Sequence, residues 1–370
     1  MAMGCEFRII AKDKNTKAKT GILRVGERQV ETPAFMPVGT QASVKGQTPS
    51  EVVSSGHKII CLNSYHLLLR PGAGIIGDLG GLHKFMSWDY LILTDSGGFQ
   101  VYSMAPISSI TDDGINFTSH IDGAKIDLTP ELSIKVQEEI GTDIAMALDV
   151  CPTYTLDRTE IERAVNLTHR WAERAKVARV RDDIALLGII QGGVFMDLRE
   201  KSATDIKSIG FDGYAVGGLS VGEPRKARLE IAEGLSGFLP DDKIRYIMGV
   251  GFPEEIVRFV SFGYDLFDCV LPTRCGRNGL AFTKSGLINL RRPEYRTDST
   301  PLEDDCSCPA CKGFSKAYLA HLFRAKEMLA PRLVSLHNLY HYGWLFDRIR
   351  ESIRTGTFDS FSEKFYEIDI

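Results

Sequence analysis

Short apolar runs of strand length recur along the chain, each followed by a Gly, Pro or polar cluster and then by a helix-like stretch. Eight runs span residues 33–38, 58–62, 90–93, 144–148, 186–190, 213–216, 245–248 and 266–271. Their hydrophobicity is continuous, which is typical of strands buried on both faces of a parallel sheet. Crossover helices are expected at residues 130–139, 157–179, 198–208, 224–235 and 253–261. Eight such repeats predict an α/β protein with a closed (β/α)8 TIM barrel.

The composition supports a large folded core. With 44% apolar and 25% charged residues, a chain of 370 residues suits one large barrel with an appendage. We find no run of about 18 apolar residues, and the first ten residues lack the pattern of a signal peptide. We therefore expect a cytoplasmic protein whose eight cysteines are thiols or metal ligands. The net charge of -4 indicates that any contact with RNA must be local.

Two segments interrupt the repeat. Residues 7–32 alternate in polarity and contain turn residues, which predicts an antiparallel hairpin that closes the bottom of the barrel. Residues 107–128 contain Asp112-Asp113-Gly114 and Asp122-Gly123, so we interpret them as an insertion after the third strand. The expected division is a catalytic barrel over residues 1–288, a zinc-binding subdomain over 289–341, and a C-terminal helix returning to the barrel over 342–370.

Polar and glycine residues cluster directly after the apolar runs. In a (β/α)8 barrel the carboxyl ends of all strands converge at one mouth, where active sites are built. The clusters after the second to seventh runs are Asn63-Ser64, Asp95-Ser96-Gly97-Gly98, Asp149, Gln191-Gly192-Gly193, Gly217-Gly218 and Gly249-Val250-Gly251. The sequence therefore predicts one polar pocket at the mouth of the barrel.

Three thiols lie close together near the C-terminus, at Cys306, Cys308 and Cys311, and two histidines, His337 and His341, follow in an expected helix. Three thiolates and one imidazole form a tetrahedral zinc site. A loop of free thiols is the alternative, but exposed clustered thiols oxidise readily. Because four protein ligands leave no open coordination position, the zinc would be structural. Spacing alone does not choose between the two histidines.

Two aspartates at strand ends are candidates for catalysis. Asp95 follows the third apolar run, and Asp268 lies in the eighth. Two carboxylates facing one pocket suit chemistry at a glycosidic bond, since one attacks the anomeric carbon while the other transfers protons. Each could instead be an ordinary capping or salt-bridged acid. A barrel hydrolase or phosphate-ester enzyme would need metal ligands or a phosphate loop at the mouth, and the sequence offers neither.

A set of ordered motifs then indicates a family. The motifs are Thr94-Asp95-Ser96-Gly97-Gly98-Phe99-Gln100, Gln191-Gly192-Gly193-Val194-Phe195, Gly217-Gly218-Leu219-Ser220-Val221-Gly222-Glu223, Met248-Gly249-Val250-Gly251 and Phe267-Asp268-Cys269-Val270-Leu271-Pro272-Thr273-Arg274. Together with the cysteine cluster, they resemble the tRNA-guanine transglycosylase (queuine tRNA-ribosyltransferase) family of the bacterial type, over essentially the whole chain.

This resemblance implies a zinc-bearing barrel enzyme of queuosine biosynthesis. Such an enzyme removes guanine from the wobble position of tRNAs with GUN anticodons and inserts a 7-deazaguanine. By match to the family motifs, Asp268 would be the nucleophile that forms a covalent ribosyl intermediate, and Asp95 the general acid/base. The resemblance also favours His337 over His341 as the fourth zinc ligand, and it implies a homodimer without ATP or a redox cofactor.

The hydrogen-bonding groups of guanine then assign the base pocket. Asp149 can accept from the ring N–H and the exocyclic amine, while Gln191 and the backbone N–H of Gly218 can donate to the carbonyl oxygen. Phe99 and Met248 would sandwich the base, although core packing is the alternative for both. The remaining substrate-binding candidates are Ser96, Leu219 and Val221.

The identity of the incoming base rests on the residues around its 7-substituent. The resemblance places this group near Leu219, Ser220, Val221 and Glu223, and Val221 favours 7-aminomethyl-7-deazaguanine over the bulkier queuine, which remains the alternative. Many bacterial relatives carry Glu where Val150 stands here, which affects the contact expected for a cationic aminomethyl group. A non-catalytic tRNA-binding paralogue is a further alternative, but it should lack the nucleophile that Asp268 supplies.

A local excess of positive charge lies beside the eighth strand. Residues 270–297 contain six basic residues and one acid, Glu294. Such an excess suits contact with RNA phosphates, although a solvated basic face is the alternative. The predicted RNA-binding residues are Arg274, Arg277, Arg291 and Arg292.

Overall fold

Eight parallel strands form a closed barrel in the computed structural model, which describes residues 4–99, 108–154 and 157–366. Around the barrel they are β4 (Ala34–Gly39), β5 (Ile59–Asn63), β6 (Leu91–Asp95), β10 (Ile144–Met146), β11 (Ala185–Ile190), β12 (Gly213–Val216), β13 (Ile244–Ile247) and β14 (Leu266–Cys269). β14 pairs with β4 and closes the ring. Each strand falls on one of the eight predicted runs, so the predicted TIM barrel is confirmed.

The continuous hydrophobicity of the strands follows from burial on both sides. In β11, Leu187 and Ile189 point into the barrel, whereas Leu186 and Ile190 pack beneath the outer helices. Both sets are fully buried, which is why the strand does not alternate in polarity.

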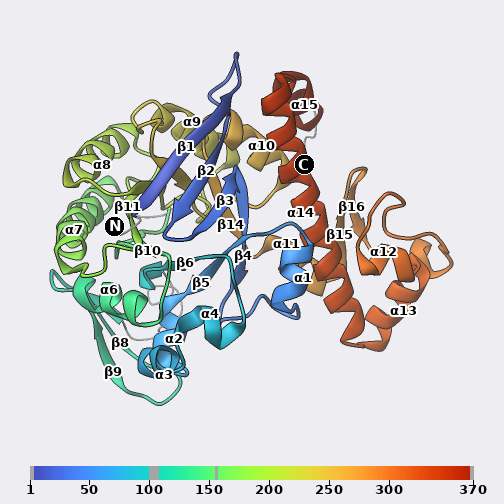
Figure 1. The fold of residues 1–370 in the computed structure, drawn as a ribbon, viewed down its shortest axis with the longest axis horizontal. Coiled ribbons are helices and arrows are strands. Elements are labelled where there is room, and N and C mark those ends of the chain that lie inside the picture. Colours follow the sequence, from blue (N-terminus) through green and yellow to red (C-terminus); the bar gives the residue numbers. More distant parts are fainter. Residues whose placement is uncertain (1–3, 100–107, 155–156, 367–370) are drawn as a thin grey trace.

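The five predicted crossover helices are present on the outside of the barrel (Figure 1). They are α6 (Pro130–Glu139), α7 (Arg158–Ala178), α8 (Met196–Ile209), α9 (Arg225–Ser236) and α10 (Pro253–Ser261). Thr129 and Asp157 cap α6 and α7, because each side chain accepts from a backbone N–H of the first turn. Short helices that the sequence analysis did not predict are α1 (Pro49–Ser54), α2 (Ser64–Leu69), α3 (Ala73–Asp78), α4 (Gly81–Met86) and α11 (Leu271–Arg277).

The amino-terminal segment is a three-stranded antiparallel sheet of β1 (Cys5–Lys12), β2 (Lys19–Val25) and β3 (Arg28–Thr32). It contains the predicted hairpin plus one further strand. Leu23, Val25 and Val30 pack against the interior residues of the barrel, and Lys19 pairs with buried Asp265, just before β14, at 3.3 Å. The sheet therefore covers the amino end of the barrel and leaves the carboxyl end for a site.

The insertion after β6 is also antiparallel. Its strands are β7 (Ser108–Ile110), β8 (Ile115–Thr118) and β9 (Lys125–Leu128). The two predicted turns, at 112–114 and 122–123, connect them.

The C-terminal part contains β15 (Leu280–Thr283), β16 (Gly286–Asn289), a 3-10 turn (Pro293–Arg296), α12 (Pro309–Gly313), α13 (Lys316–Ala325), α14 (Leu329–Thr355) and α15 (Phe358–Tyr366). In Figure 1, α14 stands between the barrel and the segment that holds α12 and α13. The helix runs without a break across residue 341, and the Tyr342 hydroxyl donates to the Gly251 carbonyl at the barrel mouth. We propose the same three-part division, with α14 shared. None of the described helices is long and apolar enough to cross a membrane.

Candidate active site and metal centre

Asp268 lies on β14 at the mouth of the barrel. Its Oδ1 accepts from the Tyr246 hydroxyl at 2.6 Å and from the Gly249 N–H at 2.8 Å. Burial raises the pKa of Asp268, and these two hydrogen bonds oppose that rise because they favour the carboxylate. Both donors bond the same oxygen, Oδ1. The geometry suits an ionised oxygen that can attack an electrophile.

Asp95 ends β6 on the same rim. Its Oδ2 accepts from the Asn63 side chain at 3.0 Å, and the strand register places Asn63 directly beside it. The charges of Asp95 and Asp268 both raise the pKa of Tyr246, after burial as the main cause. The same two charges act on buried Cys61. The two predicted catalytic acids therefore face one region, with Tyr246 and Cys61 beneath it.

The predicted base-recognition residues come together on the neighbouring strands. Asp149 follows β10, is only 5% exposed, and accepts from the Gln191 side-chain amide at 2.6 Å. Burial raises the pKa of Asp149 to about 6, and hydrogen bonds from Gln191 and Ser96 oppose the rise. The arrangement offers carboxylate oxygens, and one further amide hydrogen of Gln191, to a flat polar ligand.

Gly218 forms the next wall of the pocket and requires glycine. Its φ is +63°, and a Cβ there would lie 2.2 Å from Gln191 Oε1. Any side chain would displace Gln191 and strain the backbone. Cys151 lies near the Gly218 N–H and Gln191, and burial raises the pKa of its thiol to about 12, so the thiol is neutral.

Phe99 and Met248 differ in their surroundings. Phe99 is 46% exposed, so it is not a core residue and its ring remains available to a ligand. Met248 is partly buried against the interior cluster of the barrel. Core packing therefore explains part of the surroundings of Met248, but it does not explain the exposed ring of Phe99.

The segment from Leu219 to Val221 is held by a buried acid. Glu223 accepts from the Ser220 N–H at 2.6 Å and the Val221 N–H at 2.9 Å, and from Arg228 at 3.0 Å. Arg228 compensates the negative charge of Glu223, and the two backbone bonds hold the carboxylate against the loop.

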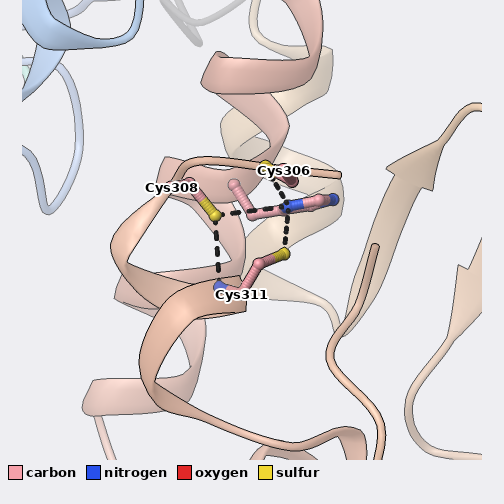
Figure 2. Close-up of side chains that lie close together, drawn as sticks. Cys306, Cys308 and Cys311 are labelled. Carbon is pink, nitrogen blue, oxygen red and sulfur yellow. Dashed lines mark hydrogen bonds between the residues drawn. The ribbon is translucent and has the colours of Figure 1, made fainter. Parts of the chain in front are cut away.

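The cysteine cluster has the geometry of a tetrahedral metal site (Figure 2). His337 Nδ1 lies 3.6, 3.5 and 3.3 Å from the sulfur atoms of Cys306, Cys308 and Cys311. All four ligand atoms lie within 4.8 Å of one another. Zinc bond lengths imply a nitrogen–sulfur edge of about 3.6 Å in a tetrahedron, so the residues fit this ion.

His337, and not His341, belongs to this cluster. The His337 Nε2 lies 2.8 Å from the Phe282 carbonyl, which can only accept, so the hydrogen is on Nε2 and the Nδ1 lone pair faces the sulfurs. His341 is instead stacked on Phe282, with ring centroids 6.2 Å apart. The geometry agrees with the ligand that the resemblance favoured.

Nearly the whole chain matches known proteins. The family model for queuine tRNA-ribosyltransferase matches residues 13–369. The queuine tRNA-ribosyltransferase of Caldanaerobacter subterraneus subsp. tengcongensis is 50% identical over 97% of this chain and 96% of its own length. Those of Desulforamulus reducens and Ruegeria pomeroyi are 47% and 48% identical, over 99% and 95% of this chain and 99% and 93% of their own lengths.

The chain belongs to the queuine tRNA-ribosyltransferase family. The family resemblance expected from the motifs is thereby confirmed. The individual roles of the site residues stay predictions.

The sequence did not predict the contacts that Tyr246, Asn63 and Arg199 make around the site of this family member. Tyr246 is an interior residue of β13, and the sequence alone indicates only a hydrophobic strand residue. In the structure its hydroxyl donates to Asp268 Oδ1. Asn63 was noted at a strand end, but its bond to Asp95 required the register. Arg199 is fully buried in α8, where a basic residue near the start of a helix reads as solvent-exposed.

The predicted RNA-binding arginines follow β14, the strand that carries Asp268. Arg274 and Arg277 are on α11, directly after β14, and Arg291 and Arg292 follow β16. Arg291 Nε donates to the Asn278 carbonyl at 2.9 Å, which brings it close to the end of α11. Arg274, Arg291 and Arg292 are exposed, while Arg277 is partly buried.

Val150, the residue after Asp149, has a buried apolar side chain. Its side chain is 8% exposed and packs in an apolar cluster with Ala164 and Leu167 of α7. A Glu at this position would therefore place a carboxyl group among apolar side chains.

Proposed function

We propose that this enzyme exchanges guanine at the wobble position of GUN tRNAs for a 7-deazaguanine through a covalent intermediate on Asp268. The observation that carries the proposal is the juxtaposition of Asp268 with a pocket that complements guanine. Asp268 Oδ2 would attack the ribose C1′ while the C1′–N9 bond breaks and its electron pair leaves with the base. Asp95 would protonate the departing base and later take a proton from the incoming one. Two displacements at C1′ give retention of configuration.

The recognition step rests on the buried acceptor and its neighbours. Asp149 would accept from N1–H and the 2-amino group, while Gln191 and the Gly218 N–H would donate to the 6-oxygen. The exposed ring of Phe99 would stack on one face of the base, and Met248 would contact the other. Ser96 supports Asp149 in the carboxylate form.

The incoming base is proposed to be 7-aminomethyl-7-deazaguanine. Leu219 and Val221 border the region where the 7-substituent would lie, and Glu223 keeps this segment in place through two backbone N–H groups. Val221 would restrict a substituent as bulky as that of queuine. Queuine as the incoming base is the competing proposal.

The remaining elements are assigned to binding and stability. The exposed arginines of α11 and the segment after β16 would contact tRNA phosphates, and the four-ligand cluster would hold one structural zinc. Homodimer formation and a cytoplasmic location, where tRNA resides, complete the proposal.

The function is tested by incubating the protein with guanine-containing tRNA and radiolabelled guanine, with the unlabelled deazaguanines as competitors. We expect incorporation of label without ATP, and stronger competition by the 7-aminomethyl base than by queuine. A protein that incorporates no label would contradict the exchange reaction, and stronger competition by queuine would exclude only the assigned base.

The pH dependence of guanine binding follows from Asp149. Guanine presents only donors on this edge, so the carboxylate form is required. With a pKa of about 6, affinity should be nearly constant above pH 7 and fall about fivefold between pH 6 and pH 5, as the carboxylate fraction falls. Calorimetric titration with guanine measures this. An Asp149→Asn variant should bind weakly at every pH, and a wild-type affinity that stays flat down to pH 5 would refute the role of Asp149.

The raised pKa of Asp149 affects the stability of the folded state with the opposite dependence on pH. Because the folded-state pKa lies above the usual value of 3.8, Asp149 favours the folded state most below about pH 4, and this contribution is lost as the pH rises through 6. Binding and stability should therefore respond to pH in opposite directions.

A further inference from the structure

Arg199 is a buried cation that the proposed mechanism does not use. It lies in the first turns of α8 and is 0% exposed. Its guanidinium donates to four backbone carbonyls, those of Gly193 (2.9 Å), Ile190 (2.9 Å), Gly217 (2.7 Å) and Gly218 (3.1 Å). These carbonyls belong to the ends of β11 and β12, so one side chain fixes the two strand ends that form the wall of the base pocket.

The positive charge of Arg199 is not cancelled by an ion pair. Among the described residues no carboxylate lies within ion-pair distance, and the guanidinium is satisfied by carbonyl dipoles. Burial lowers the pKa of Arg199 to about 10, which still leaves it charged at neutral pH. A buried charge without a counter-ion is costly, so its place beneath the pocket calls for an explanation.

The bond to Gly217 links this charge to the ligand. The carbonyl of Gly217 and the N–H of Gly218 belong to one peptide group, with the oxygen and the hydrogen on opposite sides. A guanidinium bonded to the oxygen draws electron density from the nitrogen and makes the N–H a stronger donor. That N–H also lies near the Cys151 thiol, a weak acceptor that a carbonyl oxygen can replace.

We propose that Arg199 is a positioning residue that sets specificity for a 6-oxo base: it aims and polarises the Gly218 N–H through the Gly217 carbonyl. This inference rests on the proposed function, in which that N–H donates to the base oxygen. A role in packing alone would stabilise the fold without distinguishing one atom of the ligand from another.

The chain provides a matched control in Arg245. Arg245 is 2% exposed and donates to the carbonyls of Leu239 (2.6 Å) and Pro240 (3.2 Å), and unlike Arg199 it also pairs with a carboxylate, that of Asp241, at 2.6 Å. It lies at the start of β13, at the opposite end of the barrel. A lysine at either position keeps the charge but loses the forked donor geometry.

The test compares guanine with 6-thioguanine, in which sulfur, a larger atom and a weaker acceptor, replaces the oxygen at position 6; Arg245→Lys controls for the difference in size. Dissociation constants are measured for wild type, Arg199→Lys and Arg245→Lys, with thermal unfolding to verify folding. We expect wild type to prefer guanine, and this preference to shrink about five- to tenfold in Arg199→Lys but to persist in Arg245→Lys. Equal weakening of both bases in Arg199→Lys, or an unchanged preference, overturns the inference. A wild type that binds neither base contradicts the proposed function instead.

A second measurement needs no substitution. Glycine labelled with 13C at the carbonyl and 15N at the amide gives correlated NMR signals only at Gly-Gly pairs, which occur at 80–81, 97–98, 192–193 and 217–218. We expect the amide proton of one pair to shift downfield with guanine by clearly more than with 6-thioguanine. Identical shifts for both bases at all four pairs would rule out a polarised Gly218 donor, even if Arg199→Lys does not fold.

Discussion

Replacement of Asp268 by Asn is expected to abolish base exchange, with a loss of about 10⁴-fold or more, while the fold is retained. The amide has the same shape and can still accept from Tyr246 and Gly249, but it is a poor nucleophile toward C1′. The assay is incorporation of radiolabelled guanine into tRNA. Denaturing electrophoresis should reveal a covalent complex of protein and tRNA with wild type and none with Asp268→Asn.

Tyr246→Phe provides the graded control for this prediction. It removes the hydroxyl that donates to Asp268 at 2.6 Å and leaves the carboxylate, so we expect a decrease of about tenfold. Loss of this hydrogen bond also raises the pKa of Asp268, and activity should then begin to fall at a higher pH on the acid side. Normal exchange by Asp268→Asn would remove Asp268 as the nucleophile.

Substitution of Cys308 by Ser is expected to remove the bound zinc and to destabilise the C-terminal part severely. Cys308 is fully buried, caps α12, and is one of four ligands around a single point. Structural zinc sites contribute on the order of 10 kcal/mol to the folding of small domains, so the thermal transition of this part should fall steeply. Metal analysis and calorimetry are the measurements.

Two matched variants separate metal loss from ordinary damage. Cys275→Ser alters another buried thiol, outside the cluster, and His341→Gln alters the histidine that stacks on Phe282. Both should retain one zinc per chain, whereas His337→Gln should lose it. Full zinc content in both Cys308→Ser and His337→Gln would show that the four residues are not the ligand set.

The strands could be predicted because burial on both faces makes most residues of a strand apolar, and the crossover helices could be predicted because they lie between these runs. The runs at 186–190 and 253–261, for example, coincide with β11 and α10 almost residue for residue. The short helices α1 to α4 could not, since six residues are too few for a periodic pattern.

The chemistry of the site was less accessible from the sequence. Asp95, Asp149 and Gln191 could be predicted from their positions at strand ends, because the carboxyl ends of all barrel strands meet at one mouth. Tyr246 and Arg199 remained hidden because their partners are set by tertiary contacts: a hydroxyl reaching a neighbouring strand, and a guanidinium folded inward onto carbonyls. The choice between His337 and His341 likewise depended on which ring the Phe282 carbonyl orients.

The unbroken course of α14 makes the metal and the barrel mouth mechanically dependent. His337 faces the sulfurs, and little more than one turn later Tyr342 holds the Gly251 carbonyl, in the loop whose Gly249 N–H bonds Asp268. Because α14 is continuous between these two residues, a displacement of His337 also moves Tyr342. We therefore expect that removal of zinc from the four-residue cluster shifts this loop, and that depriving a cell of zinc limits modification of its tRNA.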